Sequence, residues 1–229
     1  MFALLFYNSS RHGLCAIGSF FSFRVNILMA GAILSAQDIS TFGLTNQVLG
    51  LLNVFSMALL TTKGPHLSHE LCQGKNEEAQ RIFSYSWISG IGMYLFFGLI
   101  GGFIAPYFLD LIQSHVVWMQ TSLFVFLLFT SFLEFNTGYF MVYMVSDNHI
   151  PYTKALLLTG GISIALTYVF LFILGWGLWW AVLSTFISQS LFNNWYWIYY
   201  FTKRYKISFL ALFIKGIRES KMAFKGALQ

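Results

Sequence analysis

The sequence predicts an all-α protein that crosses a membrane about six times, with both termini in the cytoplasm. Three observations support this prediction. The 229 residues are 57% hydrophobic and only 9% charged, with a mean hydropathy of +0.67, whereas a soluble domain carries about 25% charged residues. The hydrophobic residues form runs of about 20, the length that a helix needs to cross the hydrocarbon core. Lys and Arg fall in alternate connecting segments, as in multi-pass membrane proteins.

Six hydrophobic runs are long enough to be membrane spans. They cover residues 14–34, 43–61, 82–109, 118–144, 155–174 and 178–201. Runs such as SLFVFLLFTSFL lack the alternation of polar and apolar residues that is typical of a transmembrane β-strand. We therefore expect residues 1–202 to form one bundle of six transmembrane helices.

Individual runs carry further signals. The third and fourth are long enough to cross at a tilt. The third has small residues four apart, at Ser86 and Gly90 and again at Gly98 and Gly102, which let helix backbones approach closely. The sixth begins with a Trp pair and ends among Trp and Tyr residues, which favour the two membrane interfaces. We expect the third helix to pack inside the bundle.

The distribution of Lys and Arg predicts the orientation. Three connecting segments contain neither residue type: 35–42, 110–117 and 175–177. The alternate segments hold every Lys and Arg but one, namely Arg11, Lys63, Lys75, Arg81, Lys154 and seven in the last 27 residues. Because Lys and Arg favour short cytoplasmic loops, we expect both termini in the cytoplasm, and an even number of spans agrees with this.

The last segment, residues 203–229, forms a basic tail. Its seven basic residues alternate with apolar ones such as Phe209, Leu210 and Phe213, and its one acidic residue is Glu219. This composition is typical of an amphipathic helix that lies on anionic lipid. We favour this interpretation over a short seventh span.

The usual motifs of soluble enzymes do not occur. The sequence contains no GxxxxGK phosphate loop, HExxH, CxxC or GxSxG motif, so we expect no enzyme activity, no cofactor, no metal and no nucleic-acid partner. The run HLSHELC places His66, His69, Glu70 and Cys72 close together, a set that suits a transition metal. A polar cytoplasmic loop beside a proline explains the same residues, and we favour that interpretation.

Two ionisable residues, Arg24 and Glu134, lie within predicted spans. Each is about ten residues from the cytoplasmic end of its span, or about 15 Å at 1.5 Å per residue. We therefore expect the two side chains to meet near the middle of the membrane. Five amides occur in the first, second and fourth predicted spans, at Asn26, Asn46, Gln47, Asn53 and Asn136. Since none of these groups is stable against lipid, we expect a polar, water-accessible cavity.

The intramembrane charges have two interpretations. Arg24 and Glu134 either form a buried ion pair that only fixes helix packing, or they act on a substrate. We favour the second, because a cation in a cavity binds phosphate through charge-assisted hydrogen bonds. Arg24 is then the anion ligand, with Asn26 and Asn53 as further substrate-binding residues. Glu134, with Asn136, is then either its counter-ion or a group that takes up a proton.

Two stretches resemble a known family. The run DISTFGLTNQVLGLLNVFSMALLTTKGPHLSHELCQGKNEEAQRIFSYSW, with Pro65, Ser68 and its basic–acidic GKNEEAQR segment, is similar to part of a six-helix half in the multidrug/oligosaccharidyl-lipid/polysaccharide exporter superfamily. That part is the first two helices and the loop after them. The stretch that starts FNTGYFMVYMVSDN and ends FNNWYW resembles later helices in the polysaccharide branch, which includes O-antigen flippases. The resemblance covers residues 14–205.

The resemblance implies a multi-pass flippase of the bacterial inner membrane. Its substrate would be a polyprenyl-diphosphate-linked oligosaccharide, a precursor of O-antigen, capsule or exopolysaccharide, moved between leaflets by alternating access. Family members contain two six-helix halves, so the resemblance also implies either a missing second half or a homodimer. A drug/cation antiporter of the same superfamily, a membrane enzyme of polysaccharide assembly and a non-transporting remnant are the alternatives.

Overall fold

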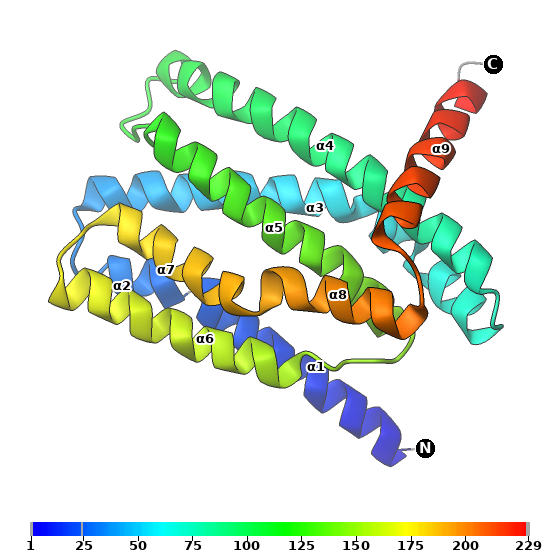
Figure 1. Ribbon diagram of the computed structural model, residues 1–229. Coiled ribbons are helices and arrows are strands. Elements are labelled where there is room, and N and C mark those ends of the chain that lie inside the picture. Colours follow the sequence, from blue (N-terminus) through cyan, green and yellow to red (C-terminus); the bar gives the residue numbers. More distant parts are fainter. Residues whose placement is uncertain (1, 24, 228–229) are drawn as a thin grey trace.

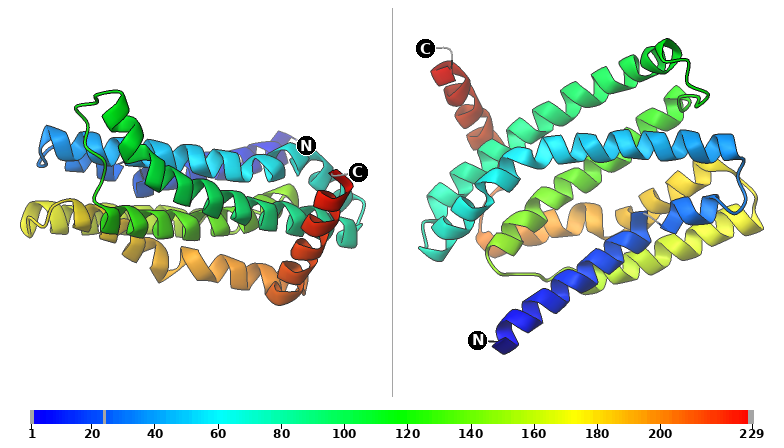
Figure 2. Two further views of the ribbon diagram at one scale, coloured as in Figure 1. Left: turned by 90° about the horizontal axis from the view of Figure 1, so that it is seen from above. Right: turned by 180° about the vertical axis from the view of Figure 1, so that it is seen from behind.

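The computed structural model describes residues 2–23 and 25–227, and this part of the chain is helical without a strand. The elements are α1 (Phe2–Phe23), α2 (Val25–Ala30), α3 (Ala36–Cys72), α4 (Asn76–Leu111), α5 (Thr121–Ser146), α6 (Thr153–Tyr168), a π-helical turn η1 (Val169–Ile173), α7 (Leu178–Leu191), α8 (Asn193–Tyr205) and α9 (Phe209–Ala227). The predicted all-α class is therefore confirmed for the described residues. The long helices run side by side, with α5 through the middle (Figures 1 and 2).

Five segments of the described chain are long and apolar enough to cross a membrane. They are Ser9–Ala30, Ala36–Cys72, Asn76–Leu111, Thr121–Ser146 and Thr153–Ile173. They correspond to the first five predicted spans. The sixth predicted span, 178–201, is divided between α7 and α8, which have only 14 and 13 residues. Neither piece alone reaches the length of about 20 residues that a crossing requires.

The prediction of a polar loop around HLSHELC is wrong. Helix α3 continues through Pro65 to Cys72, and a tight turn with Gly74 at φ 72° leads directly into α4. The extra turns are stable because Leu67 is fully buried and Glu70 is 6% exposed. The Glu70 carboxylate lies 3.7 Å from Nδ1 of His66 and 3.8 Å from Nζ of Lys75. These charged contacts therefore stabilise the C-terminal end of α3 and the turn into α4.

Small residues set the closest helix contacts. On α1 and α6, Gly18 and Gly160 face each other: a Cβ at Gly18 would lie 2.8 Å from the carbonyl carbon of Leu156, and one at Gly160 would lie 2.9 Å from the carbonyl oxygen of Gly18. On α4, a Cβ at Gly90 would lie 2.7 Å from the carbonyl oxygen of Ser56. The expectation that the third span lies inside the bundle is wrong: only 17% of its apolar window is buried, the smallest share among the five spans, although its backbone approaches α3 closely at Gly90.

Aromatic rings fill the end of the bundle where α4, α5, α8 and α9 meet. We call this group the aromatic cluster; it consists of Phe83, Trp87, Phe140, Tyr143, Phe201, Tyr205 and Phe209. The centroid of the Phe83 ring lies 5.3 Å from that of Phe140 and 5.2 Å from that of Tyr143, both edge-on. Such pairs stabilise beyond the area that they bury. The cluster therefore fixes four helices to one another.

The basic tail forms α9, which crosses α4 at this same end (Figures 1 and 2). Arg81 on α4 has a guanidinium nitrogen 3.7 Å from the Glu219 carboxylate, and Lys215 donates to the backbone carbonyl of Glu77 at 3.0 Å. Arg81 also hydrogen-bonds to the Glu78 carboxylate at 2.6 Å. Helix α9 is thus held against α4 by charged pairs at the surface. The rings of Trp87 and Phe209, with centroids 5.1 Å apart, add an apolar contact.

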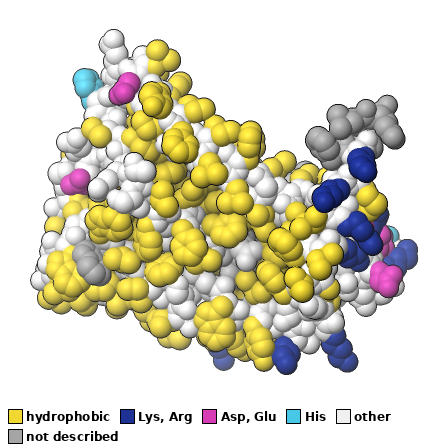
Figure 3. Space-filling model, turned by 45° about the horizontal axis from the view of Figure 1, so that its top comes forward, with side chains coloured by type: hydrophobic (Ala, Val, Ile, Leu, Met, Phe, Trp, Pro, Cys, Tyr) yellow, Lys and Arg dark blue, Asp and Glu magenta, His cyan; other side chains and the backbone are white. Residues whose placement is uncertain are grey.

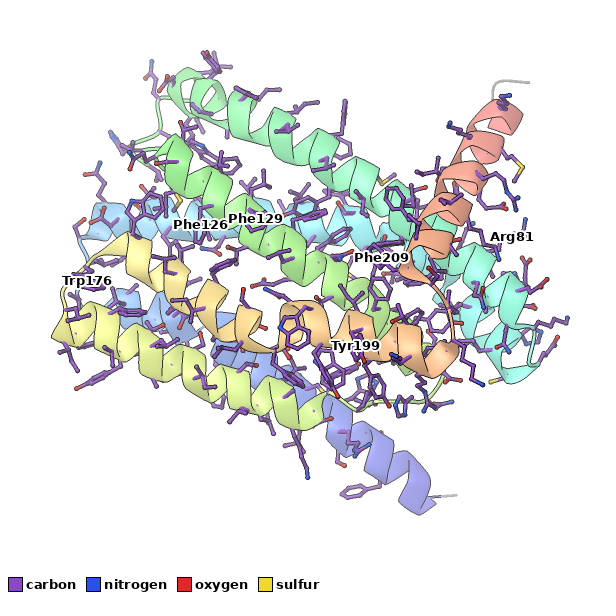
Figure 4. The ribbon with its side chains drawn as sticks, in the orientation of Figure 1. Arg81, Phe126, Phe129, Trp176, Tyr199 and Phe209 are labelled. Carbon is purple, nitrogen blue, oxygen red and sulfur yellow. The ribbon has the colours of Figure 1, made fainter. Side chains whose placement is uncertain are left out.

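Charge is separated along the molecule. The Lys and Arg side chains in view gather at the end that carries α9, while hydrophobic side chains cover much of the face between the ends (Figure 3). Both termini lie towards this basic end (Figure 1). Trp176 lies at the opposite end from Arg81 and Phe209 (Figure 4). The basic segments of the sequence thus come together in space.

The close contact at Gly90 predicts a specific sensitivity. A methyl group there would collide with the hydroxyl of Tyr139, which donates to the backbone carbonyls of Ser56 and Ser86 at 2.7 and 3.0 Å. We expect Gly90→Ala to lower the thermal unfolding temperature in detergent, with a loss of about 1–3 kcal/mol. The control is Gly92→Ala, because that glycine has no atom within 4 Å of a built Cβ. Equal unfolding temperatures for the two variants would contradict the observed packing.

Candidate functional site

A cavity of about 600 Å³ lies inside the bundle. Hydroxyl, amide and carboxyl groups from α1, α2, α3, α5, α7 and α8 line it: Ser19, Asn26, Asn46, Asn53, Thr130, Ser131, Glu134, Thr137, Thr185, Gln189, Asn193 and Asn194. Apolar residues such as Leu49, Met57 and Phe135 complete the wall. Among the described lining residues, Glu134 is the one with an ionisable carboxyl. The predicted polar cavity is therefore present in the described part of the chain.

The wall of the cavity includes the break at Phe192 between α7 and α8. The backbone of Phe192 has φ −145° and ψ −53°, which ends α7 at Leu191. Helix α8 then starts with Asn193 and Asn194, and both line the cavity. Irregular backbone at membrane depth is tolerated where it is buried in protein or lines a cavity. The position of the break beside the polar wall satisfies that condition.

Side-chain hydrogen bonds join α7 and α8 across the break, and one of them reaches a backbone carbonyl near the end of α7. Asn193 is 2% exposed and donates to Oγ1 of Thr159 at 2.9 Å and to Oε1 of Gln189 at 2.8 Å. The indole of Trp195 donates to the backbone carbonyl of Ser190 at 3.2 Å, near the end of α7. A helix terminus without such partners is costly when it is buried. These contacts make the break a stable feature of the fold.

Four buried polar atoms on the cavity wall have no hydrogen-bond partner within the described protein. They are Oδ1 of Asn53, Oε1 of Glu134, Nε2 of Gln189 and Oδ1 of Asn194. A buried polar group without a partner costs about 1–3 kcal/mol, so such groups are rare unless they serve a purpose. All four atoms are covered by the protein, so a ligand in the cavity would reach these three oxygens and one nitrogen only after their side chains change rotamer. They come from α3, α5, α7 and α8.

A second set of polar side chains closes the side of the cavity next to α6. The amide of Asn26 donates to Oγ of Ser163 at 3.1 Å and to Oγ1 of Thr185 at 2.6 Å, and its oxygen accepts from Thr167 at 2.7 Å. These bonds join α2 to α6 and α7. Asn26 is 2% exposed. Its amide is thus occupied by the protein itself.

The predicted site residues separate into three groups. Asn26, Asn53 and Glu134 line the cavity, as expected for residues of one site. Asn136 does not: its Oδ1 accepts from the Trp87 indole at 2.7 Å, because two residues along a helix turn about 200° to the other face. Arg24 lies outside the residues that the structure describes, so its pairing with Glu134 stays a prediction.

The cavity also contains polar residues that the sequence interpretation did not select. Gln189, Asn193 and Asn194 on the sixth span belong to the run FISQSLFNN. Their signal was available, since Gln189 and Asn193 are four apart within a predicted span, the spacing that places two residues on one helix face. In contrast, Gln47, which was expected to face the interior, is exposed.

Ring contacts join α5 to α7 near the cavity. Phe126 and Phe129 on α5 (Figure 4) pack on Phe186 of α7, with ring centroids 5.1 and 6.3 Å apart. These contacts hold α7 against α5 on one side of the break. Helix α5 is therefore held by ring contacts at two places: with Phe186 of α7, and with the aromatic cluster at the basic end.

Comparison of the chain with protein-family models, curated proteins and solved structures finds no match. The chemistry of the cavity is therefore inferred from its own residues. Amides and hydroxyls both donate and accept hydrogen bonds, whereas an ionised carboxylate only accepts. This combination suits a ligand rich in hydroxyl groups or one that carries a positive charge.

The hydrogen bonds of Asn26 predict a structural role for its amide. We expect Asn26→Ala to lower the thermal stability of the purified protein by about 1–3 kcal/mol, because Ser163 and Thr167 lose a buried partner. The matched control is Asn46→Ala on the same cavity, since Asn46 bonds only to the carbonyl of Phe42 in its own helix. If thermal unfolding in detergent shows the larger loss for Asn46→Ala, the assignment of the Asn26 network is incorrect.

Proposed function

We propose that this chain is a membrane transporter, and that it forms half of a flippase for a lipid-linked oligosaccharide in a bacterial inner membrane. The observation that carries the proposal is the polar cavity inside the apolar bundle. Polar groups are costly within a membrane and mark the path of a substrate or an ion. The resemblance of residues 14–205 to polysaccharide exporters supplies the substrate class.

The size and chemistry of the cavity favour a sugar headgroup. A volume of about 600 Å³ falls within the range of about 300–1,000 Å³ that ligand sites occupy. The unpartnered atoms of Asn53, Gln189 and Asn194 include both donors and acceptors, and sugar hydroxyls need both. We propose that the diphosphate binds Arg24, as its place in the predicted first span suggests, while the wall of the cavity binds sugar.

We propose that α7 and α8 together make a sixth, broken span, so that both termini lie in the cytoplasm. The residues from Leu178 to Tyr205 are then one crossing with an interruption at Phe192. Transporters often place substrate or ion sites at such interruptions. The gathering of Lys and Arg at the end that holds both termini supports this orientation. A second half, either another chain or another copy, would complete the path for alternating access.

A drug/cation antiporter is the second candidate, and one observation favours it. Three of the four unpartnered atoms on the cavity are oxygens, including one of the Glu134 carboxyl. Buried oxygens around a carboxylate stabilise a cation. In this candidate Glu134 binds the exported cation or the coupling ion.

A flipping assay tests the proposed function. We expect proteoliposomes that contain the full chain to move a fluorescent polyprenyl-diphosphate-linked disaccharide between leaflets, measured by loss of fluorescence to an external quencher. Glu134→Gln removes the charge and keeps the shape, and we expect it to slow the movement about tenfold, the effect of one hydrogen bond to a charged group. Asp110→Asn, an exposed carboxyl at the end of α4, is the control and should leave the rate unchanged.

The same liposomes separate the two candidates. Export of a cationic dye that depends on Glu134, without movement of the disaccharide lipid, would favour the antiporter. Movement of neither probe by liposomes that bind neither would contradict transport by copies of this chain alone.

The orientation has its own test, because Cys72 is an exposed free cysteine at the basic end and Cys15 is buried. We expect a membrane-impermeant maleimide to leave intact bacterial cells unlabelled and to label Cys72 in inside-out membrane vesicles. The Cys72→Ser variant is the control for labelling at Cys15. Labelling of Cys72 from the outside of intact cells would reverse the proposed topology.

A further inference from the structure

A second, separate cavity of about 290 Å³ lies at the basic end, where α4 begins and α8 ends. The polar side chains that line it are Asn76, Gln80, Tyr143, Arg204, Tyr205 and Lys206. None of these lines the central cavity. The two sites are therefore distinct.

Tyr143 marks this small cavity as a built site. Its side chain belongs to the aromatic cluster and is only 1% exposed, and no hydrogen bond from its hydroxyl occurs within the described protein. A hydroxyl that faces a cavity and has no hydrogen-bond partner in the protein can donate a hydrogen bond to a ligand in that cavity. The amides of Asn76 and Gln80 on the first turns of α4 add further donors beside it.

The charge at the rim is positive. Arg204 lies 3.8 Å from the Asp147 carboxylate, which also accepts from the Tyr205 hydroxyl at 2.7 Å. The charge of Asp147 is thus compensated within the described protein. Lys206 is exposed and makes no ion pair with a described residue, so its charge is free to act on a ligand.

The other acids near this rim are Glu77 and Glu78 in the first turn of α4, and Glu78 is paired with Arg81 at 2.6 Å. The start of α4 itself adds partial positive charge, since the amide groups of a helix N-terminus favour anions. The Tyr143 hydroxyl, the two amides and the Lys206 ammonium group therefore line one small cavity, beside the guanidinium that pairs with Asp147.

We propose that this cavity binds the phosphate headgroup of an anionic phospholipid from the surrounding membrane. Phosphate accepts several hydrogen bonds at once and pairs with Lys and Arg. Basic pockets at the cytoplasmic ends of transmembrane helices are typical lipid sites. Apolar surface adjoins the pocket, because Phe209 and Leu210, at the start of α9, are 41% and 64% exposed. The headgroup occupies the pocket while the acyl chains lie along this surface.

This lipid site goes beyond the proposed transport function and does not rest on it. A headgroup in the pocket contacts α4, α5 and α8 together. Its phosphate supplies the acceptor that the Tyr143 hydroxyl lacks. The bound lipid thus ties the end of the broken sixth span to the rest of the bundle.

Native mass spectrometry of the purified full chain tests the site. The probes are dioleoylphosphatidylglycerol and, as the neutral comparison, dioleoylphosphatidylcholine. We expect preferential binding of the phosphatidylglycerol. Tyr143→Phe removes only the hydroxyl, and Lys206→Asn removes the charge with a residue that tolerates the left-handed φ of 53° at this position. Each variant should weaken phosphatidylglycerol binding about tenfold.

Lys221→Asn is the matched control, because it removes the same charge from the exposed face of α9, outside the pocket. It should leave binding within about twofold, the spread of a screened surface charge. If Lys221→Asn weakens phosphatidylglycerol binding as much as Lys206→Asn does, the binding reflects general attraction of the lipid to the basic tail, and the proposed site is wrong. Unchanged binding in Tyr143→Phe and Lys206→Asn, with unfolding temperatures equal to that of the parent, would also overturn it.

Inorganic phosphate distinguishes a lipid from a free anion. We expect millimolar phosphate to leave the phosphatidylglycerol bound, because the acyl chains contribute to its affinity. If phosphate alone displaces the lipid and binds the parent but not Lys206→Asn, the pocket is a site for soluble phosphate and the lipid proposal is wrong.

Discussion

Hydrogen-bond satisfaction in an apolar solvent is the constraint on which this bundle depends. A polar side chain that faces hydrocarbon has no water to bond to, so amides and hydroxyls turn toward one another. Where partners are complete, as around Asn26, the result is a rigid joint between α2, α6 and α7. Where partners are missing, as at Glu134 and Asn194, polar atoms are left unpaired beside the cavity. The cost of leaving a buried polar group unpaired therefore shapes both the helix packing and the wall of the cavity.

The two ends of the bundle are held in different ways. At the basic end, ring contacts and the charged pairs of α9 tie four helices together. At the other end, the helices are joined through the contact of Phe186 with α5 and through short connections. The central cavity lies between these regions, and the small basic cavity lies within the more tightly held end.

Sequence reasoning succeeded where the signal was local and energetically large. Hydrophobic runs predicted five helices that can cross a membrane, and the cost of buried polar groups placed Asn53 and Glu134 on one cavity. It failed where tertiary contacts determine the end of a helix or the partner of a side chain. The burial of Leu67 carries α3 past Pro65, and the Trp87 indole takes Asn136 away from the cavity. The break at Phe192 lies beside the contact of Asn193 with Thr159 on α6, which no single run of residues reveals.

The interruption at Phe192 also has a mechanical consequence. In a continuous helix, a tilt at one end moves the other, because the backbone hydrogen bonds run through its whole length. Here α8 is held by Phe201 and Tyr205 in the aromatic cluster, whereas α7 is joined to it through one non-helical residue. Rotation about the two backbone dihedrals of that residue would reorient α7 without breaking the backbone hydrogen bonds inside either helix, but it would break the contacts of Gln189 with Asn193 and of Ser190 with Trp195. The hinge residue of such a movement, Phe192, lies next to Asn193 and Asn194, which line the cavity.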